Sequence, residues 1–554
     1  MSIKNFLMKP QGLPYDYDIW KNKAFPEKAK MICQAWAMQG FGAPKFIILF
    51  YTIKILLYGW VWLFFCSYSA ELGTLANISK WWFKFEALGK GAAWTMLIES
   101  IGFGGASGPL TARYMPPLGG ILYYLRPGTI KIPLFKKLAD NRTIFDIALY
   151  VAFIYFLLKL CLASAITPQL LIPIIFLLPI LGMLDTQLFL SARADVWFPI
   201  LLVYIFPDQL KGGLIICWFG IWFWAAFSKL TASFPSVVSV MISNSPFMGF
   251  KWLKKLLYKN YPEDLRMRNS ANYVAHFGTV IEFILPIILL LNACYFHNDT
   301  VGLYTIIGMS VFHLFIFSNF PMGVPLEWNV MMVYGAWVLF GNQHPTITVN
   351  LHSPLLIVIL SISFFALPLL GNFFPKYISF LLSMRYYAGT WAYSVWLFKD
   401  DSKHEKLEPN IVKTSPDLRK QLSIFYDDKL ALSILSRTMS FRLMHLPGRA
   451  LVDLIPKAVN NLNAYYWMDG EMLAGEVIGW NFGEGHLHSE KLLNSIQKRC
   501  HFDKDELKVI MVESPQLHNG KMYWRIYDAN EGMIENGYVY IKDLKEKMPW
   551  KVDE

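Results

Sequence analysis

The sequence predicts an all-α polytopic membrane domain of about ten spans, some of them short or broken, followed by a small cytoplasmic α+β domain. Three observations predict this fold class. Of the 554 residues, 55% are hydrophobic and only 16% are charged, whereas soluble proteins carry roughly 25% charged residues. The aromatic fraction is also 16%, and Trp and Tyr concentrate where hydrocarbon meets lipid headgroups. After about residue 399 the chain becomes polar, which predicts a domain outside the bilayer.

The first part of the chain predicts an arm and then a membrane helix. Residues 1–45 are polar and lysine-rich and are expected to form a cytoplasmic or interfacial N-terminal arm. The polytopic domain follows at 46–398, and its first span runs from Phe46 to about Tyr68. Lys54 lies about two turns inside this span and is expected to snorkel toward the headgroups. Residues 91–109 are glycine-rich and only moderately apolar, which predicts a broken element beside a cavity.

The remaining crossings are expected at apolar segments separated by polar loops. A basic loop at 251–268 belongs to the cytoplasm, and the turns at 297–300 and 343–353, which contain no Lys or Arg, belong outside. This asymmetry places both ends of the chain in the cytoplasm. The expected segments lie near 144–166, 168–191, 196–207, 212–229, 273–296, 301–319, 328–342 and 354–374.

The polar end of the chain predicts a linker with helices at 399–470 and a small α+β domain at 471–554. Residues 489–500 have the pattern of an amphipathic helix. Short turns rich in Asn and Gly separate the strand-like runs after it, which predicts hairpins. The three expected strands lie at 507–513, 521–528 and 537–544.

The net charge of +11 argues for lipid and against nucleic acid as the partner. The positive residues cluster just outside apolar segments, which is typical of loops that contact anionic membrane lipids. Six cysteines are scattered without a C-x-x-C pair, so the sequence predicts no disulfide framework and no structural zinc site.

Ionisable residues inside the apolar segments are the main candidates for function. A charged side chain in a span costs several kcal/mol unless it is paired or faces water. One such residue often serves as a hydrogen-bonding partner between helices, whereas several that meet in a cavity mark a substrate or proton path. Lys229 is either an anchor at a helix end or, desolvated by Trp and Phe, a general base. The candidates are Glu99, Asp185, Lys229, His276, Glu282, His313 and Glu327.

Three of these segments resemble those of a known superfamily in the expected order. "WFGIWFWAAFSKL", "GTVIEFILPIILLL" and "VFHLFIFSNFPMG" are similar to helices of the vitamin K-dependent γ-carboxylase superfamily, which includes bacterial relatives with a horizontally transferred transmembrane domain. In that group a membrane lysine acts as the base of a quinone-dependent step, and the resemblance assigns this role to Lys229. His313 and Glu282 match features of the helices. The peptide-binding region of the γ-carboxylases is missing, which argues against glutamate carboxylation.

A closer resemblance covers nearly the whole chain. "PLEWN" (325–329) and "GWNFGEGHLHSE" (479–490) are similar to a bacterial family of multi-pass membrane proteins that is catalogued only as a domain of unknown function. This resemblance implies the bacterial inner membrane as the location and implies no activity.

The second of these phrases contains a candidate metal site. On an extended strand His486, His488 and Glu490 would share one face and could hold Zn or Fe. Alternatively, Gly483 and Gly485 make a turn and Glu490 favours the N-terminus of the following helix.

Together these observations predict a membrane-embedded enzyme that acts on a lipid-like or long apolar substrate. Lys229 would be a general base or polarising cation, helped by His313 and by the acids Glu282 and Glu327. The cofactor is unknown, and a quinone or a divalent metal is compatible with the site. A transporter or channel-like protein is the first alternative. The second is a non-catalytic membrane scaffold that recruits a protein partner through its C-terminal domain.

Overall fold

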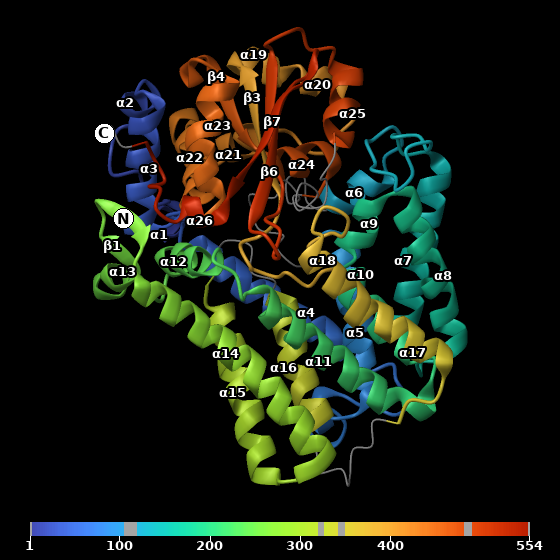
Figure 1. Cartoon of the computed structure of the whole chain (residues 1–554). Coiled ribbons are helices and arrows are strands. Elements are labelled where there is room, and N and C mark those ends of the chain that lie inside the picture. The colour runs from blue at the N-terminus through green and yellow to red at the C-terminus, as the bar shows by residue number, and fades with distance from the viewer. Residues whose placement is uncertain (1–2, 105–118, 320–325, 342–349, 481–489, 552–554) are drawn as a thin grey trace.

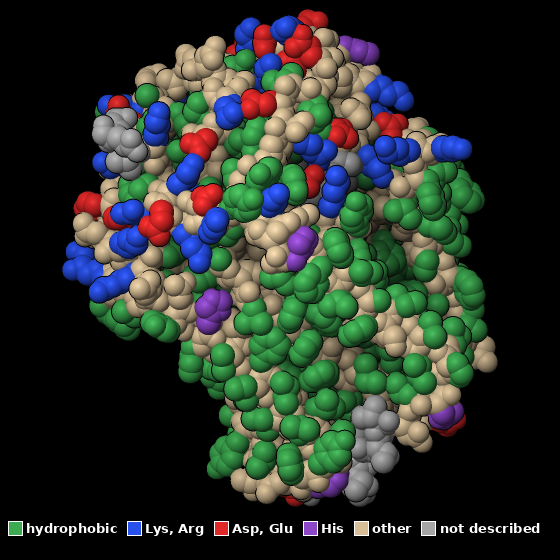
Figure 2. All heavy atoms as spheres, in the orientation of Figure 1, with side chains coloured by type: hydrophobic (Ala, Val, Ile, Leu, Met, Phe, Trp, Pro, Cys, Tyr) green, Lys and Arg blue, Asp and Glu red, His purple; other side chains and the backbone are tan. Residues whose placement is uncertain are grey.

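A computed structural model of the chain describes residues 3–104, 119–319, 326–341, 350–480 and 490–551. Long helices make up one half of the molecule, and a β-sheet covered by shorter helices makes up the other half (Figure 1). Figure 2 shows that charged side chains gather over the half that carries the sheet, whereas hydrophobic side chains cover the helical half. This partition is the one expected when only the helical half lies in a bilayer.

In the described residues, six helical segments are long and apolar enough to cross a membrane, by length and composition. A membrane protein is thereby confirmed, while the number of about ten crossings stays a prediction because four further apolar helices are shorter. The six are α4 (Phe46–Cys66), α7 (Ile144–Leu162), α11 (Leu210–Ser228) with the turn before it, α14 (Asn269–Leu291) with the π-turn after it, α15 (Asp299–Phe317), and α17 (Pro354–Ser361) continued by α18 (Leu367–Phe373). The four are α8 (Pro168–Leu184), α10 (Ala194–Val203), α12 (Phe234–Asn244) and α16 (Leu326–Phe340).

The segment predicted to be broken begins as a regular helix. α5 (Phe85–Ser100) is buried along almost its whole length and packs against α7, α10 and α16. Gly102, just after it, has a φ of +86°, which an L side chain rarely adopts. Residues 105–109 of the predicted element lie outside the described residues. Shorter elements connect these helices: η1 (Leu75–Lys80), α6 (Gly119–Leu125), α9 (Thr186–Ser191) and η2 (Pro207–Gln209).

The sheet has five antiparallel strands in the order β4-β3-β5-β6-β7. Two of the expected strands are confirmed with almost the same bounds, and the third begins five residues earlier and ends in the short helix α26 (Ile541–Leu544). Two strands, β3 and β4, had no counterpart in the prediction; β4 is an edge strand and β3 is an interior strand. The strands are β3 (Tyr393–Lys399), β4 (Tyr465–Asp469), β5 (Leu507–Val512), β6 (Lys521–Asp528) and β7 (Gly532–Tyr540).

The central strands β3 and β5 are buried on both faces because their side chains alternate between two cores. Val395 and Ile510 are paired in the register and lie in the core shared with the N-terminal arm. Trp396 and Val509, the next pair, lie in the opposite core. Helices cover both faces: α19 (Asp400–Glu405), α20 (Leu407–Asn410), α21 (Leu418–Ser423), α22 (Asp428–Met444), α23 (Leu451–Ala458), α24 (Gly470–Ile478) and α25 (Lys491–Cys500).

The N-terminal arm is an integral part of the sheet-bearing half. α3 (Phe25–Gln39) packs against α22, and its buried Trp36 donates its indole N–H to the carbonyl of Val240, 3.2 Å away. The basic loop predicted at 251–268 is ordered and packs here too, since the guanidinium of Arg449 donates to the carbonyl of Leu265. The remaining elements are α1 (Ile3–Met8), α2 (Tyr17–Lys21), α13 (Lys251–Leu257), β1 (Tyr258–Asn260) and β2 (Asp264–Met267).

Candidate functional site

Lys229 and Glu282 form a buried ion pair between two membrane helices. Lys229 is the C-cap of α11, and Glu282 lies in the middle of α14, which packs directly against α11. The Lys229 Nζ is 2.6 Å from Oε1 and 2.5 Å from Oε2 of Glu282. Only 6% of Lys229 and 3% of Glu282 is exposed, so the amine does not reach toward the headgroups. Of the two predicted roles for Lys229, the anchor at a helix end is wrong.

His313 is buried in α15 and both of its ring nitrogens are engaged. The Trp222 indole N–H, on α11, donates to His313 Nε2 across 3.1 Å. Because Nε2 accepts, the proton of a neutral imidazole lies on Nδ1, which is 2.9 Å from Oδ1 of Asn329 on α16 and donates to it. The histidine is therefore held in one tautomer by its neighbours.

Glu327, in the first turn of α16, is fully buried and faces the first span. Its Oε1 lies 2.8 Å from the Nζ of Lys54 on α4. The expectation that Lys54 snorkels is wrong, because its amine is buried against the carboxylate of Glu327. The two groups are near enough for a strong charge interaction, and no hydrogen bond to either oxygen of Glu327 is found among the described residues.

These groups come from one set of neighbouring helices. α11 packs against α14 and α16, α14 against α15, and α15 against α16, while α4 contacts α16. Trp222 and Lys229 are seven residues apart on α11, so their side chains leave the same face about two turns apart. The structure therefore brings the four predicted catalytic residues into a single helix cluster, and their catalytic roles stay predictions.

A further polar cluster next to these helices escaped the sequence analysis. Arg193 and Asp195 form a double contact of 3.1 and 3.0 Å, and Asp195 also accepts a hydrogen bond from the hydroxyl of Tyr386. Edge-to-face contacts run from Tyr386 through Trp328 to His313, with ring centroids 5.7 and 5.9 Å apart. The polar break between the predicted spans at 168–191 and 196–207 was the available signal, since it contains both charges.

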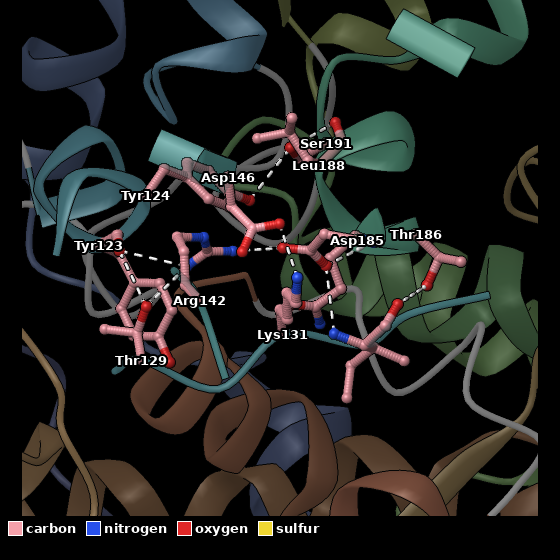
Figure 3. Close-up of polar contacts among 12 residues, drawn as sticks. Tyr123, Tyr124, Thr129, Lys131, Arg142, Asp146, Asp185, Thr186, Leu188 and Ser191 are labelled. Atoms are coloured by element: carbon pink, nitrogen blue, oxygen red, sulfur yellow. Dashed lines mark hydrogen bonds and ion pairs between the residues drawn. The ribbon is translucent and has the colours of Figure 1, made fainter. Parts of the chain in front are cut away.

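Asp185 belongs to a different, structural cluster (Figure 3). Its carboxylate pairs with Arg142 and accepts the backbone N–H of Ile132 across 3.2 Å. Beside it, Lys131 pairs with Asp146 across 2.6 Å. These contacts tie the loop before α7 to the junction of α8 and α9, so Asp185 holds the loop in place.

The two remaining candidates are His276 on α14 and Glu99 on α5. His276 is half-buried one and a half turns before Glu282, with its ring 6.4 Å from that of Phe234. Glu99 is buried near the end of α5, where a Cβ on Gly104 would meet its carboxylate.

The predicted metal site falls mostly outside the described residues, which exclude His486 and His488. Glu490 is described and is the N-cap of α25, where its carboxylate accepts from Arg525 across 2.7 Å and from the hydroxyl of Tyr527. No group of three or more His, Cys, Asp or Glu side chains suited to a metal occurs in the part of the chain that the structure describes. Within that part, the carboxylate of Glu490 accepts hydrogen bonds from an arginine and a tyrosine.

Comparison with known proteins gives one match. The model of a family described as "Transmembrane protein of unknown function (DUF3556)" matches residues 6–554. Neither the curated proteins nor the solved structures contain a match to the chain.

Proposed function

We propose that this chain, which belongs to the DUF3556 family of transmembrane proteins, is a membrane-embedded enzyme acting on a lipid-like or long apolar substrate. The observation that carries the proposal is the buried Lys229–Glu282 pair in a cluster of membrane helices. Burying two charges costs several kcal/mol per ion before their attraction offsets it, so ionisable residues inside membrane helices mark a candidate functional site.

The pair supplies a base through one internal proton transfer. Moving a proton from Lys229 Nζ to Glu282 across 2.5–2.6 Å gives a neutral amine and a neutral acid, both of which a low-dielectric site tolerates better than ions. The neutral amine can accept a proton from an acidic C–H or O–H of the substrate. The substrate anion then lies beside a lysine cation, which stabilises it. In the same helix cluster, hydrogen bonds with Trp222 and Asn329 orient the ring of His313.

The resemblance of the segments around Lys229, Glu282 and His313 to the γ-carboxylase superfamily supports a lysine base. It also suggests a quinone as the co-substrate and the bacterial inner membrane as the location. A divalent metal is the alternative cofactor, and a protein partner at the C-terminal domain remains part of the proposal.

A proton-coupled transporter is the second candidate, and one observation favours it. Lys54 and Glu327 form another buried ion pair on helices that adjoin the first pair. Proton relays in membrane proteins usually consist of successive ionisable groups inside the membrane.

The test uses the double variant Lys229→Met/Glu282→Leu, which removes both charges together and leaves no unpaired ion in the fold. The full-length protein is reconstituted in vesicles of bacterial lipid extract, with and without a reduced quinone, and untargeted mass spectrometry follows the lipids. The wild type is expected to convert one lipid class, and the double variant at least 100-fold less, a typical size for loss of a general base. Lys159→Met is the matched control, because Lys159 is an exposed lysine in the last turn of span α7.

Conversion by the double variant at the wild-type rate would refute the catalytic role of the pair. Loss of proton-coupled solute uptake in the same vesicles, without lipid conversion by the wild type, would instead support the transporter. Vesicles in which the wild type does neither would support the scaffold.

A further inference from the structure

β7 is an edge strand, and its side away from β6 pairs with no other described strand (Figure 1). The backbone N–H of Ile541 donates to the carbonyl of Gly520 across 3.0 Å, which identifies these opposed residues as a hydrogen-bonded pair. Hydrogen-bonded and non-hydrogen-bonded pairs alternate along antiparallel strands. The backbone N–H and C=O groups of Asn536, Tyr538 and Tyr540 therefore point away from β6, toward the open edge of the sheet.

Exposed hydrophobic side chains concentrate on the same hairpin. Among the described residues that follow Tyr426, only four large hydrophobic side chains are exposed, and all four lie on β6 or β7. They are Tyr523, Met533, Ile534 and Tyr538. Edge strands often carry a lysine or a proline that prevents the addition of another strand, and β7 contains neither. The exposed apolar side chains and the unpaired backbone therefore favour an additional strand beside β7.

Two lysines give this edge a positive charge. Lys521 is opposed to Tyr540 in the register, so the side chains of both lie on one face of the sheet. The Lys521 Nζ is 4.4 Å from the centroid of the Tyr538 ring, and the Lys542 Nζ is 5.2 Å from that of Tyr540. Neither amine forms an ion pair with a described residue. The face beside the open edge is thus complementary to acidic side chains.

The orientation of the strands argues against a second copy of this chain as the occupant. The strands run between the helical half and the far end of the molecule (Figure 1). At the near end, His518 in the β5–β6 connection has its ring 5.9 Å from that of Phe374, directly after α18. Antiparallel pairing of two copies requires a two-fold axis perpendicular to the strands. Such an axis would invert one copy relative to the membrane, so a segment of another protein fits the edge better.

We propose that β7 binds an extended acidic segment of a second protein as a further antiparallel strand. The backbone of the segment pairs with residues 536–540, and its acidic side chains lie on the face that carries Lys521 and Lys542. Main-chain hydrogen bonds supply the affinity, while the lysines and tyrosines select the side chains. This inference rests on the protein partner that forms part of the proposed function, and it is independent of the chemistry at Lys229.

The probe is a fluorescein-labelled peptide of alternating valine and glutamate, in which all glutamates lie on one face of an extended strand. Fluorescence anisotropy measures its binding to the full-length protein in a neutral detergent. The same peptide with lysine in place of glutamate is expected to bind about tenfold more weakly, because its charges repel Lys521 and Lys542. Equal binding of the two peptides would overturn the acidic class of the partner.

Methylation of the peptide backbone tests strand addition directly. Side chains of directly opposed residues share a face, so in the antiparallel register the amides of the glutamates face β7. N-methylation of the glutamate amides is expected to abolish binding, whereas N-methylation of the valine amides should change the affinity less than twofold. Equal effects of the two methylations would overturn the proposed strand pairing.

A matched pair of variants tests the same contact from the side of the protein. Asn536→Pro removes a backbone donor that faces the open edge and is expected to weaken binding about tenfold. Asn536→Ala keeps that donor and should change the affinity less than twofold. A dimer of the full-length protein that Asn536→Pro dissociates would show instead that a second copy occupies the edge. If Asn536→Pro fails to fold, the methylated peptides decide the question.

The charge is tested with two exposed or half-exposed lysines of the same domain. Lys521→Gln is expected to weaken binding of the glutamate peptide about fivefold. Lys504→Gln is the control, because Lys504 is exposed and pairs with Glu531 in the turn at the other end of the hairpin. Equal effects of both variants would overturn the location. Lipid conversion by Asn536→Pro should equal that of the wild type, which distinguishes a failure of this inference from a failure of the proposed catalysis.

Discussion

Two lysines in membrane helices pair with buried carboxylates. The sequence places one of them inside a predicted span and the other at the end of one. Lys229 pairs with Glu282 and Lys54 with Glu327. In each case the two partners lie on different helices, far apart in the sequence. A lysine stem is long enough to snorkel, but a buried carboxylate that had no cation would itself be costly. The position of the buried carboxylate therefore determines the orientation of the lysine side chain.

The Lys229–Glu282 pair is expected to behave as a unit in stability measurements. Lys229→Met leaves the Glu282 charge buried without its cation, so it should cost about 3–5 kcal/mol of unfolding free energy. The Lys229→Met/Glu282→Leu variant leaves no charge and should cost far less than the sum of the single variants. Chemical unfolding in detergent micelles measures the cycle. Additive losses would contradict a direct interaction.

Glu476 carries a charge outside the membrane helices whose effect depends on pH. Burial by itself raises the pKa of Glu476, but His404 and Lys413 lower it to about 2. Lys413 Nζ lies 2.5 Å from Oε1, while His404 Nε2 is 3.6 Å from Oε2. The folded pKa is thus below the unfolded value of about 4.3, so the stabilisation is present above that value and is lost as pH falls toward 2.

Glu476→Gln is therefore expected to destabilise the protein by about 3 kcal/mol at pH 6 and by about half of that at pH 3. Unfolding of both proteins at the two pH values tests this. A difference that stays constant between pH 6 and pH 3 would show that the charge of Glu476 is not what stabilises the fold.

At the scale of elements, the sheet depends on strands and helices far apart in the chain. β3 lies between β4 and β5, and on one face its side chains share a core with α3 of the N-terminal arm. β3 has the all-buried pattern of a central strand, which by periodicity alone cannot be distinguished from the end of an apolar helix. This is why the polytopic segment was expected to run to residue 398.

The contact between α3 and this core predicts a long-range effect on the sheet. Trp36→Ala removes a fully buried indole and should lower the free energy of unfolding by about 3–5 kcal/mol. Hydrogen exchange of β3 and β5 amides should increase with it. Lys30→Ala, an exposed position on the same helix, is the control and should change neither quantity. Unchanged exchange in β3 would contradict a shared core.

The whole molecule is polarised between an apolar half and a charged half (Figure 2). Both ends of the described chain lie in the charged half, and the turn between α14 and α15 lies at the opposite end of the molecule (Figure 1). The turn at 297–300 contains no Lys or Arg, and its location outside the cell stays a prediction, because translocated loops carry few positive charges.

Labelling of single cysteines in intact cells measures this polarity. In a Cys294→Ser background, Thr300→Cys in the first turn of α15 should react with a membrane-impermeant maleimide from outside. Glu405→Cys in the sheet-bearing half should react only after the cells are opened. Both positions are exposed, so access and not burial decides the result. Labelling of both from the same side would rule out the predicted orientation.

The sequence by itself determined the membrane class, the positions of most apolar helices, the strands β5 and β6, and the ionisable residues worth following. These properties depend on composition and on short-range periodicity, which are local. Only the tertiary structure decided that β3 and β4 join the sheet, that the N-terminal arm shares its core, and that Lys54 meets Glu327. Each of these is a contact between segments that are far apart in the sequence, and the choice among partners depends on packing that no local pattern encodes. For the same reason, the sequence did not predict that Tyr386 joins Arg193 and Asp195 in one cluster.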